Sequence, residues 1–106
     1  MTYKEFVKNM DKEDFISDIY VIVDDEGNHK NILSGFVGVY HENISPSLRE
    51  ILNDTVVDHF YKEGPYGNGY AYILYLDIRV DSVNTVHSVD VKIGGKTYHN
   101  KVVSKY

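Results

Sequence analysis

The pattern of apolar and polar positions is most regular between Tyr70 and Val80, where it repeats every two residues. A period of two with many aromatic and β-branched residues predicts a β-strand. Both faces are apolar near the start of this stretch, which indicates a central strand that is partly covered on each side. One face would carry Tyr72, Leu74, Leu76, Ile78 and Val80, and the other Ala71, Ile73, Tyr75, Asp77 and Arg79.

The chain before residue 45 predicts a short helix followed by a hairpin. Thr2 and Glu5 have the spacing of a capping box, and apolar residues follow at helical spacing up to Met10. Alternation from about residue 18 to 24 and from about residue 30 to 41 predicts two antiparallel strands joined by a glycine-containing turn. Gly35 and Gly38 in the second strand indicate a bulge, a bend or the close approach of a helix.

The main helix is predicted to begin after Ser45 and to end at Gly64. Ser45 is a cap residue before a proline at the first helical position, and Gly64 with the proline after it would stop the helix. The residues between them place an apolar stripe on one side, formed by Leu48, Ile51, Leu52, Val56 and Phe60. We therefore expect this helix to pack across the sheet.

The last predicted element is a hairpin around the turn Gly94-Gly95, with strands from about residue 86 to 93 and from 96 to 103. In the simplest register, the facing pairs are Ile93 with Lys96, Val91 with Tyr98, and Val89 with Asn100.

The order of elements is therefore α-β-β-α-β-β-β. It predicts one α+β domain over residues 1–106, with a five-stranded, mainly antiparallel sheet, the main helix across it and the short N-terminal helix nearby. A crossover through the main helix would make the second strand parallel to the central one.

Composition limits the fold to one domain. The 106 residues suffice for one core but not for two. No apolar run approaches the roughly 18–20 residues that a membrane helix needs, and the N-terminal residues lack the pattern of a signal peptide. The chain has no cysteine, which excludes disulfides, thiol nucleophiles and thiolate metal ligands. We therefore expect a cytoplasmic protein.

Charge is unevenly distributed along this chain of formal net charge −5. Residues 1–90 hold all sixteen acidic residues and seven basic ones, whereas residues 91–106 hold four lysines and no acid. The acidic balance disfavours direct binding to nucleic acid. The C-terminal lysines have two interpretations: weak, salt-sensitive phosphate contacts, or protection of an exposed edge strand. The same C-terminal edge strand leaves a homodimer open, through extension of the sheet.

No motif in the chain predicts catalysis, a metal site or a cofactor. The five histidines are scattered, and none belongs to a His-Glu-x-x-His pair. No serine lies in a nucleophile elbow, and the loop Gly67-Asn68-Gly69 lacks the Gly-Lys-Ser/Thr ending of a phosphate loop. We therefore expect a protein that is not an enzyme and that uses no cofactor.

Acidic residues recur every four positions along the predicted main helix, at Glu50, Asp54 and Asp58. Like charges at this spacing slightly destabilise a helix, and Asp54 has no cation four residues away. The row is either a solvated helix face or a surface that meets a basic protein groove. Tyr66 and Tyr70, beside the glycine loop, would act as anchors for a partner. The alternative is that Tyr70 and Tyr72 pack against the helix end.

These observations favour a non-enzymatic binding protein. We expect an inhibitor or regulator whose acidic face blocks the basic, nucleic-acid-binding groove of a host protein. Ten tyrosines, nine lysines against two arginines and no tryptophan are typical of an AT-rich genome, which suggests a phage-encoded, anti-CRISPR-like inhibitor. The alternative is a ligand-sensing or structural domain with a pocket between the main helix and the sheet, near Gly35, Gly38 and the loop at residues 65–69.

Overall fold

A computed structural model describes residues 1–33, 41–86 and 88–100. Within these residues it forms a compact α+β domain of two helices and seven strands in two sheets. The single five-stranded sheet predicted from the sequence is therefore wrong in the number of strands and of sheets. In chain order the elements are α1 (Tyr3–Asn9), β1 (Phe15–Ile22), β2 (His29–Asn31), the 3₁₀ helix η1 (His41–Asn43), α2 (Pro46–Asn53), β3 (Val57–Tyr66), β4 (Gly69–Arg79), β5 (Ser82–Asn84), β6 (Val89–Ile93) and β7 (Lys96–Asn100).

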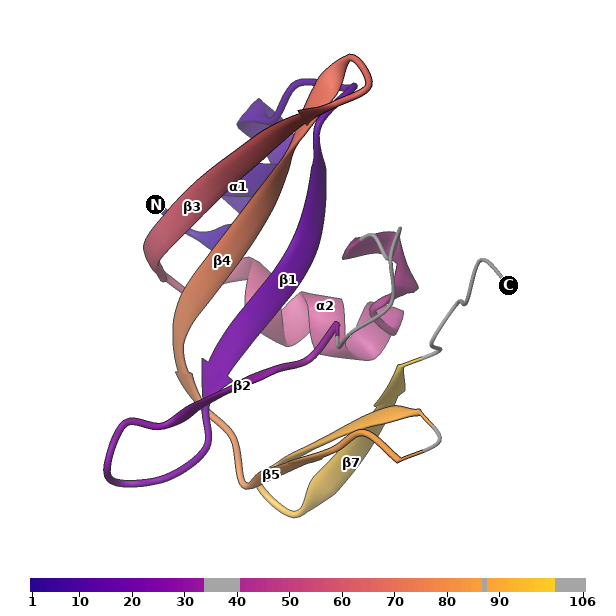
Figure 1. Ribbon diagram of the computed structural model, residues 1–106. Coiled ribbons are helices and arrows are strands. Elements are labelled where there is room, and N and C mark those ends of the chain that lie inside the picture. Colours follow the sequence, from indigo (N-terminus) through magenta and orange to yellow (C-terminus); the bar gives the residue numbers. More distant parts are fainter. Residues whose placement is uncertain (34–40, 87, 101–106) are drawn as a thin grey trace.

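The larger sheet has the strand order β2-β1-β4-β3, so β4 is a central strand as predicted (Figure 1). β1 and β2 form the predicted antiparallel hairpin. Residues 34–40 of the predicted second strand, including Gly35 and Gly38, lie outside the described residues. β4 is parallel to β1 and antiparallel to β3. The parallel neighbour of the central strand is thus the first strand, whereas the sequence favoured the second.

The predicted main helix is much shorter than expected, because α2 ends at Asn53 and the chain continues into β3. The β-branched run Thr55-Val56-Val57 lies where the helix was expected to continue, and such residues lose side-chain freedom in a helix but fit a pleated strand. Thr55 also closes the helix locally, since its hydroxyl donates to the Ile51 carbonyl oxygen at 3.1 Å. The apolar residues after position 55 therefore belong to a strand.

The two elements with the clearest local signals form as predicted. The Thr2 hydroxyl accepts a hydrogen bond from the Glu5 N–H at 3.3 Å, and the Glu5 carboxylate accepts from the Thr2 N–H at 3.0 Å, so α1 begins with a capping box. β6 and β7 pair around Gly94-Gly95 in the predicted register. The sequence analysis missed β5, which lies between the central strand and the C-terminal hairpin and pairs with β6 in a three-stranded antiparallel sheet.

One hydrophobic core joins the two sheets and the helices. Figure 1 shows α1 and α2 on the same side of the four-stranded sheet, and the core includes Phe6 and Leu52 from these helices, Leu74 from β4 and Val91 from β6. The smaller sheet also holds the start of α2, because the buried Asn100 side chain accepts a hydrogen bond from the Ser45 N–H at 2.9 Å. The face of the four-stranded sheet that α1 and α2 leave uncovered is called the outer face below.

Candidate functional site

A row of stacked rings crosses the outer face. The strand register places Tyr75 on β4 beside Tyr20 on β1 and beside His59 on β3. The Tyr20 and Tyr75 ring centroids are 4.7 Å apart with planes inclined by 7°, and those of His59 and Tyr75 are 4.3 Å apart with an inclination of 11°. These distances match the spacing of neighbouring strands. We call Tyr20, Tyr75 and His59 the aromatic ladder.

Two further rings meet the ladder edge-on. His29 on β2 lies 5.4 Å from Tyr75, and Tyr61 on β3 lies 5.9 Å from it, both with nearly perpendicular planes. The five rings therefore span all four strands of the sheet. None of them belongs to the hydrophobic core, and Tyr61 is 55% exposed, so aromatic surface faces solvent here.

Carboxylates surround these rings. Asp18, next to Tyr20 on β1, accepts hydrogen bonds from the Asn31 amide and the Ser17 hydroxyl. Burial, followed by the Asp18 charge, raises the pKa of Tyr20 above its ordinary value. Asp58 lies 2.7 Å from the Nδ1 atom of His59. Alternation places two more exposed carboxylates on this face, those of Glu63 and Asp77.

The cations of the same strands do not neutralise these carboxylates. The Lys62 ammonium lies on the opposite face, 4.2 Å from the Tyr70 ring centroid, and Arg79 pairs with Asp25. We call Asp18, Asp58, Glu63 and Asp77 the acidic rim of the outer face.

The edge of the sheet at β3 is also open. β3 has ten residues, and all of them after Val57 are exposed. The N-terminal residues cover only its start, where the Val57 N–H donates to the Met1 carbonyl oxygen at 2.8 Å and Thr2 bridges to Val56. From Asp58 onward, no strand in the described part of the chain pairs with this edge.

The structure separates the three acidic residues predicted to form one helix row. Glu50 is on α2, Asp54 is its C-terminal cap, and Asp58 is on β3. The single acidic helix face is therefore wrong, because the helix ends at Asn53. Only Asp58 belongs to the acidic rim.

The two predicted tyrosine anchors differ in their surroundings. Both flank the Gly67-Asn68 turn of the β3–β4 hairpin. Tyr66 is 55% exposed and lies 6.2 Å from the Phe15 ring, so it remains accessible to a partner. Tyr70 is half-buried under the Lys62 ammonium, and its N–H donates to the Asp14 carboxylate at 2.8 Å, so it holds the hairpin in place.

The residues that sequence reasoning missed are Tyr20, His59, Tyr61 and Tyr75. Alternation already placed Tyr20 and Tyr75 opposite the apolar residues of their strands, and this was the available signal. His59 and Tyr61 could not be recognised as their neighbours while residues 57–61 were expected to be helical.

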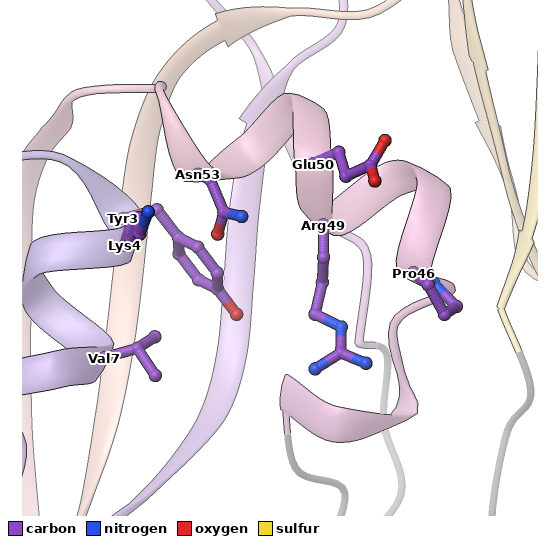
Figure 2. A pocket seen from close by; sticks show the side chains of 7 residues that line it. All are labelled: Tyr3, Lys4, Val7, Pro46, Arg49, Glu50 and Asn53. Carbon is purple, nitrogen blue, oxygen red and sulfur yellow. The ribbon is translucent and has the colours of Figure 1, made fainter.

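A separate hollow of about 320 Å³ lies between α1 and α2. The pocket predicted between the main helix and the sheet involves Gly35 and Gly38, which lie outside the described residues. Figure 2 shows the Tyr3 ring extending from α1 toward the Arg49 side chain of α2, with Asn53 beside it. Lys4 and Glu50 also line the hollow. Tyr3 is buried, and its hydroxyl has no hydrogen-bond partner among the described residues. Burial outweighs the nearby Arg49 charge and raises the pKa of the Tyr3 phenol, which therefore stays protonated.

Residues 1–33, 41–86 and 88–100 contain no group of three or more histidines and carboxylates that could hold a metal ion. No helix in this part of the chain is long and apolar enough to span a membrane. Comparisons with protein-family models, with curated proteins and with solved structures gave no match.

Proposed function

We propose that this protein is a non-enzymatic binding protein whose outer face binds a basic partner protein. The observation that carries the proposal is the aromatic ladder, which lies outside the core and is surrounded by the acidic rim. Aromatic side chains supply contact area at low entropic cost and are enriched in interface centres. Carboxylates around them favour a positively charged surface and speed its association.

The chemistry of the face favours a protein partner over a nucleic acid. Exposed aromatic residues on a sheet bind single-stranded RNA when their ring faces are free to stack on bases and the groove is positively charged. Here the rings of the ladder stack on one another, with inclinations of 7° and 11°. The acidic rim and the net charge of −5 would also repel phosphates.

The class of partner is the one expected from the sequence, a protein with a basic nucleic-acid-binding groove. The binding surface differs, since the sheet replaces the helix row. A phage-encoded inhibitor of the anti-CRISPR type is the concrete form of this proposal.

The test compares two double variants with the same change in charge. One variant, Glu63→Lys with Asp77→Lys, alters the acidic rim, and the other, Glu50→Lys with Asp54→Lys, alters α2 and its cap. The partner is isolated from lysate of a low-GC bacterium and identified, and its purified form is titrated at two salt concentrations. We expect the rim variant to lose at least about tenfold in affinity, which corresponds to about 1.4 kcal/mol, and the α2 variant to bind like wild type. Equal losses, or a loss confined to the α2 variant, would reject the outer face as the site.

The hollow between α1 and α2 supports a second candidate function, binding of a small carboxylate. The Tyr3 hydroxyl has no hydrogen-bond partner among the described residues and lies near the Arg49 guanidinium, and guanidinium groups bind carboxylates in a bidentate manner. The Tyr3 oxygen is closed off from solvent, so a ligand in the hollow reaches it only after a side-chain movement. Glu50 at the edge of the hollow disfavours a dianion such as phosphate.

Thermal melting with a panel of small carboxylates, and with phosphate as control, tests this second function. A carboxylate that stabilises wild type but not Tyr3→Phe or Arg49→Gln would support it. No stabilisation by any carboxylate, or equal stabilisation of the variants, would reject it.

A further inference from the structure

The middle of β3 is a regular strand segment with one unpaired side. Between bulges at Val57/His59 and Glu63/Tyr66, residues 59–63 pair one-to-one with β4, from His59 opposite Tyr75 to Glu63 opposite Ala71. In an antiparallel strand, alternate N–H and C=O groups point away from the paired neighbour. These groups meet no other strand of the described residues.

The usual protection of an edge strand is weak along this segment. Natural edges carry bulges, prolines or charged side chains that discourage pairing. In β3 the bulges and Pro65 lie at the ends of the segment. The one lysine, Lys62, has its ammonium over the Tyr70 ring. Phe60 and Tyr61 are exposed by 47% and 55%.

We propose that two copies of this chain pair antiparallel along β3, with Tyr61 on the two-fold axis. The two four-stranded sheets would then join into one continuous sheet of eight strands. In an antiparallel pair, two facing residues either both point their N–H and C=O groups toward the other strand or both point them away. In a two-fold dimer, one residue must therefore face its own copy across the axis, and the axis cannot lie between two successive residues. Centring the pairing on Tyr61 keeps all five facing pairs within the regular segment.

The side chains of the segment complement one another in this register. His59 faces Glu63 of the second copy, Phe60 faces Lys62, and Tyr61 faces Tyr61. Hydrogen bonding between His59 and Glu63, packing of the Lys62 stem on Phe60, and the aromatic pair stabilise neighbouring strands. No like charges face each other.

Neighbouring registers fit less well. Centring on Phe60 requires Val57 to pair outward, although its N–H already donates to Met1. Centring on Lys62 places Pro65, which has no N–H, opposite His59.

The homodimer that the sequence left open would instead use the C-terminal edge strand, and the β3 cross-links below would not form in it. The last described residue of that strand, Asn100, holds the start of α2 through the Ser45 N–H. Pairing through β3 uses the edge and leaves the outer face free. It does not require the proposed binding of a basic partner, although His59 and Glu63 take part in both surfaces, so the two proposals are separated by Tyr61→Cys, which changes neither residue.

Cysteine cross-linking tests the register directly, because the chain has no cysteine of its own. In Tyr61→Cys the two sulfur-bearing residues face each other with Cα atoms about 4.5–5.5 Å apart, within disulfide range. In His59→Cys the two cysteines are offset along the strands by four residues, or about 13 Å, which is too far for a disulfide. Under mild oxidation we expect disulfide dimers of Tyr61→Cys, none of His59→Cys, and mixed dimers when His59→Cys and Glu63→Cys are combined.

A charge test uses two variants that remove the same ring. Phe60→Glu places a carboxylate opposite Lys62 of the second copy, whereas Phe60→Lys places two ammonium groups opposite each other. By sedimentation equilibrium we expect the dimer of Phe60→Lys to dissociate at least about ten times more readily than that of Phe60→Glu, with both variants folded by circular dichroism. A wild-type protein that is monomeric at about 100 µM, or equal cross-linking of Tyr61→Cys and His59→Cys, would overturn the proposal.

Discussion

Tyr75 is the residue whose replacement tests the aromatic ladder most directly. Its ring contacts four others, stacking on Tyr20 and His59 and meeting His29 and Tyr61 edge-on. Tyr75→Val removes all four contacts at once and keeps a residue with high strand propensity. Tyr75→Phe removes only the hydroxyl and serves as the matched control.

The expected magnitude follows from these contacts. Cross-strand aromatic pairs contribute about 0.2–1 kcal/mol each, and the values do not add fully when the rings share one neighbour. With two stacked and two edge-on contacts on a half-exposed face, we expect Tyr75→Val to lower the free energy of unfolding by about 2 kcal/mol. For a domain of this size, that loss lowers the melting temperature by roughly 10 °C. Tyr75→Phe should stay within about 0.5 kcal/mol of wild type.

Urea unfolding followed by circular dichroism measures these differences, at one fixed protein concentration because dimer formation would also stabilise the fold. The slope of the unfolding free energy against urea should be the same for all three proteins. A loss below about 0.5 kcal/mol for Tyr75→Val, or an equal loss for Tyr75→Phe, would show that the stacked rings do not stabilise the sheet.

Four further substitutions test other parts of the structure. Tyr3→Phe removes a buried hydroxyl without a partner among the described residues, so urea unfolding should show no loss of stability and a gain of up to about 1 kcal/mol. A clear loss would mean that the hydroxyl is hydrogen-bonded in solution. Gly69→Ala would place a Cβ atom 1.9 Å from a backbone carbonyl oxygen of the loop before β1, and we expect a loss of about 3 kcal/mol. Gly67→Ala, where nothing lies within 4 Å but φ is +62°, should cost only about 1 kcal/mol by the same assay, and equal losses would contradict the clash. Hydrogen bonds from Asn28 hold the pKa of Asp24 below its ordinary value of 3.8. The ionised Asp24 carboxylate therefore stabilises the fold above pH 3.8. This stabilisation is lost as the pH falls through the lowered pKa. Unfolding measured from about pH 6 to pH 2 should therefore be less steep in pH for Asp24→Asn, and an unchanged slope would contradict this.

The parts of the fold that were predictable from sequence are those fixed by short-range chemistry. The capping box at Thr2 and Glu5 sets the start of α1, and the Gly94-Gly95 turn sets the register of β6 and β7. Residues 54–66 were not predictable in the same way. Their apolar side chains fit helical spacing as well as strand alternation, and the choice depended on pairing with β4, which is a tertiary contact.

In the candidate site, too, the sequence predicted local features but not those that depend on tertiary contacts. Alternation predicted that Tyr75 and Tyr20 lie on the less apolar faces of their strands. It could not predict that β1 and β4 are parallel neighbours in the register that stacks the two rings, because that depends on strand order. The acidic residues were recognised as a group, but the helix ends before Asp58, so Glu50 and Asp54 stay with α2 and only Asp58 lies on the outer face.

The hydrogen bond between Asn100 and Ser45 has a consequence for how the molecule unfolds. It joins the last described residue of β7 to the cap of α2 across 55 positions of sequence. The Ser45 amide is satisfied by that side chain alone, so its hydrogen exchange reports whether the C-terminal hairpin is docked. A single amide signal in an NMR spectrum can therefore follow the attachment of one sheet to the other, without any label on the hairpin itself.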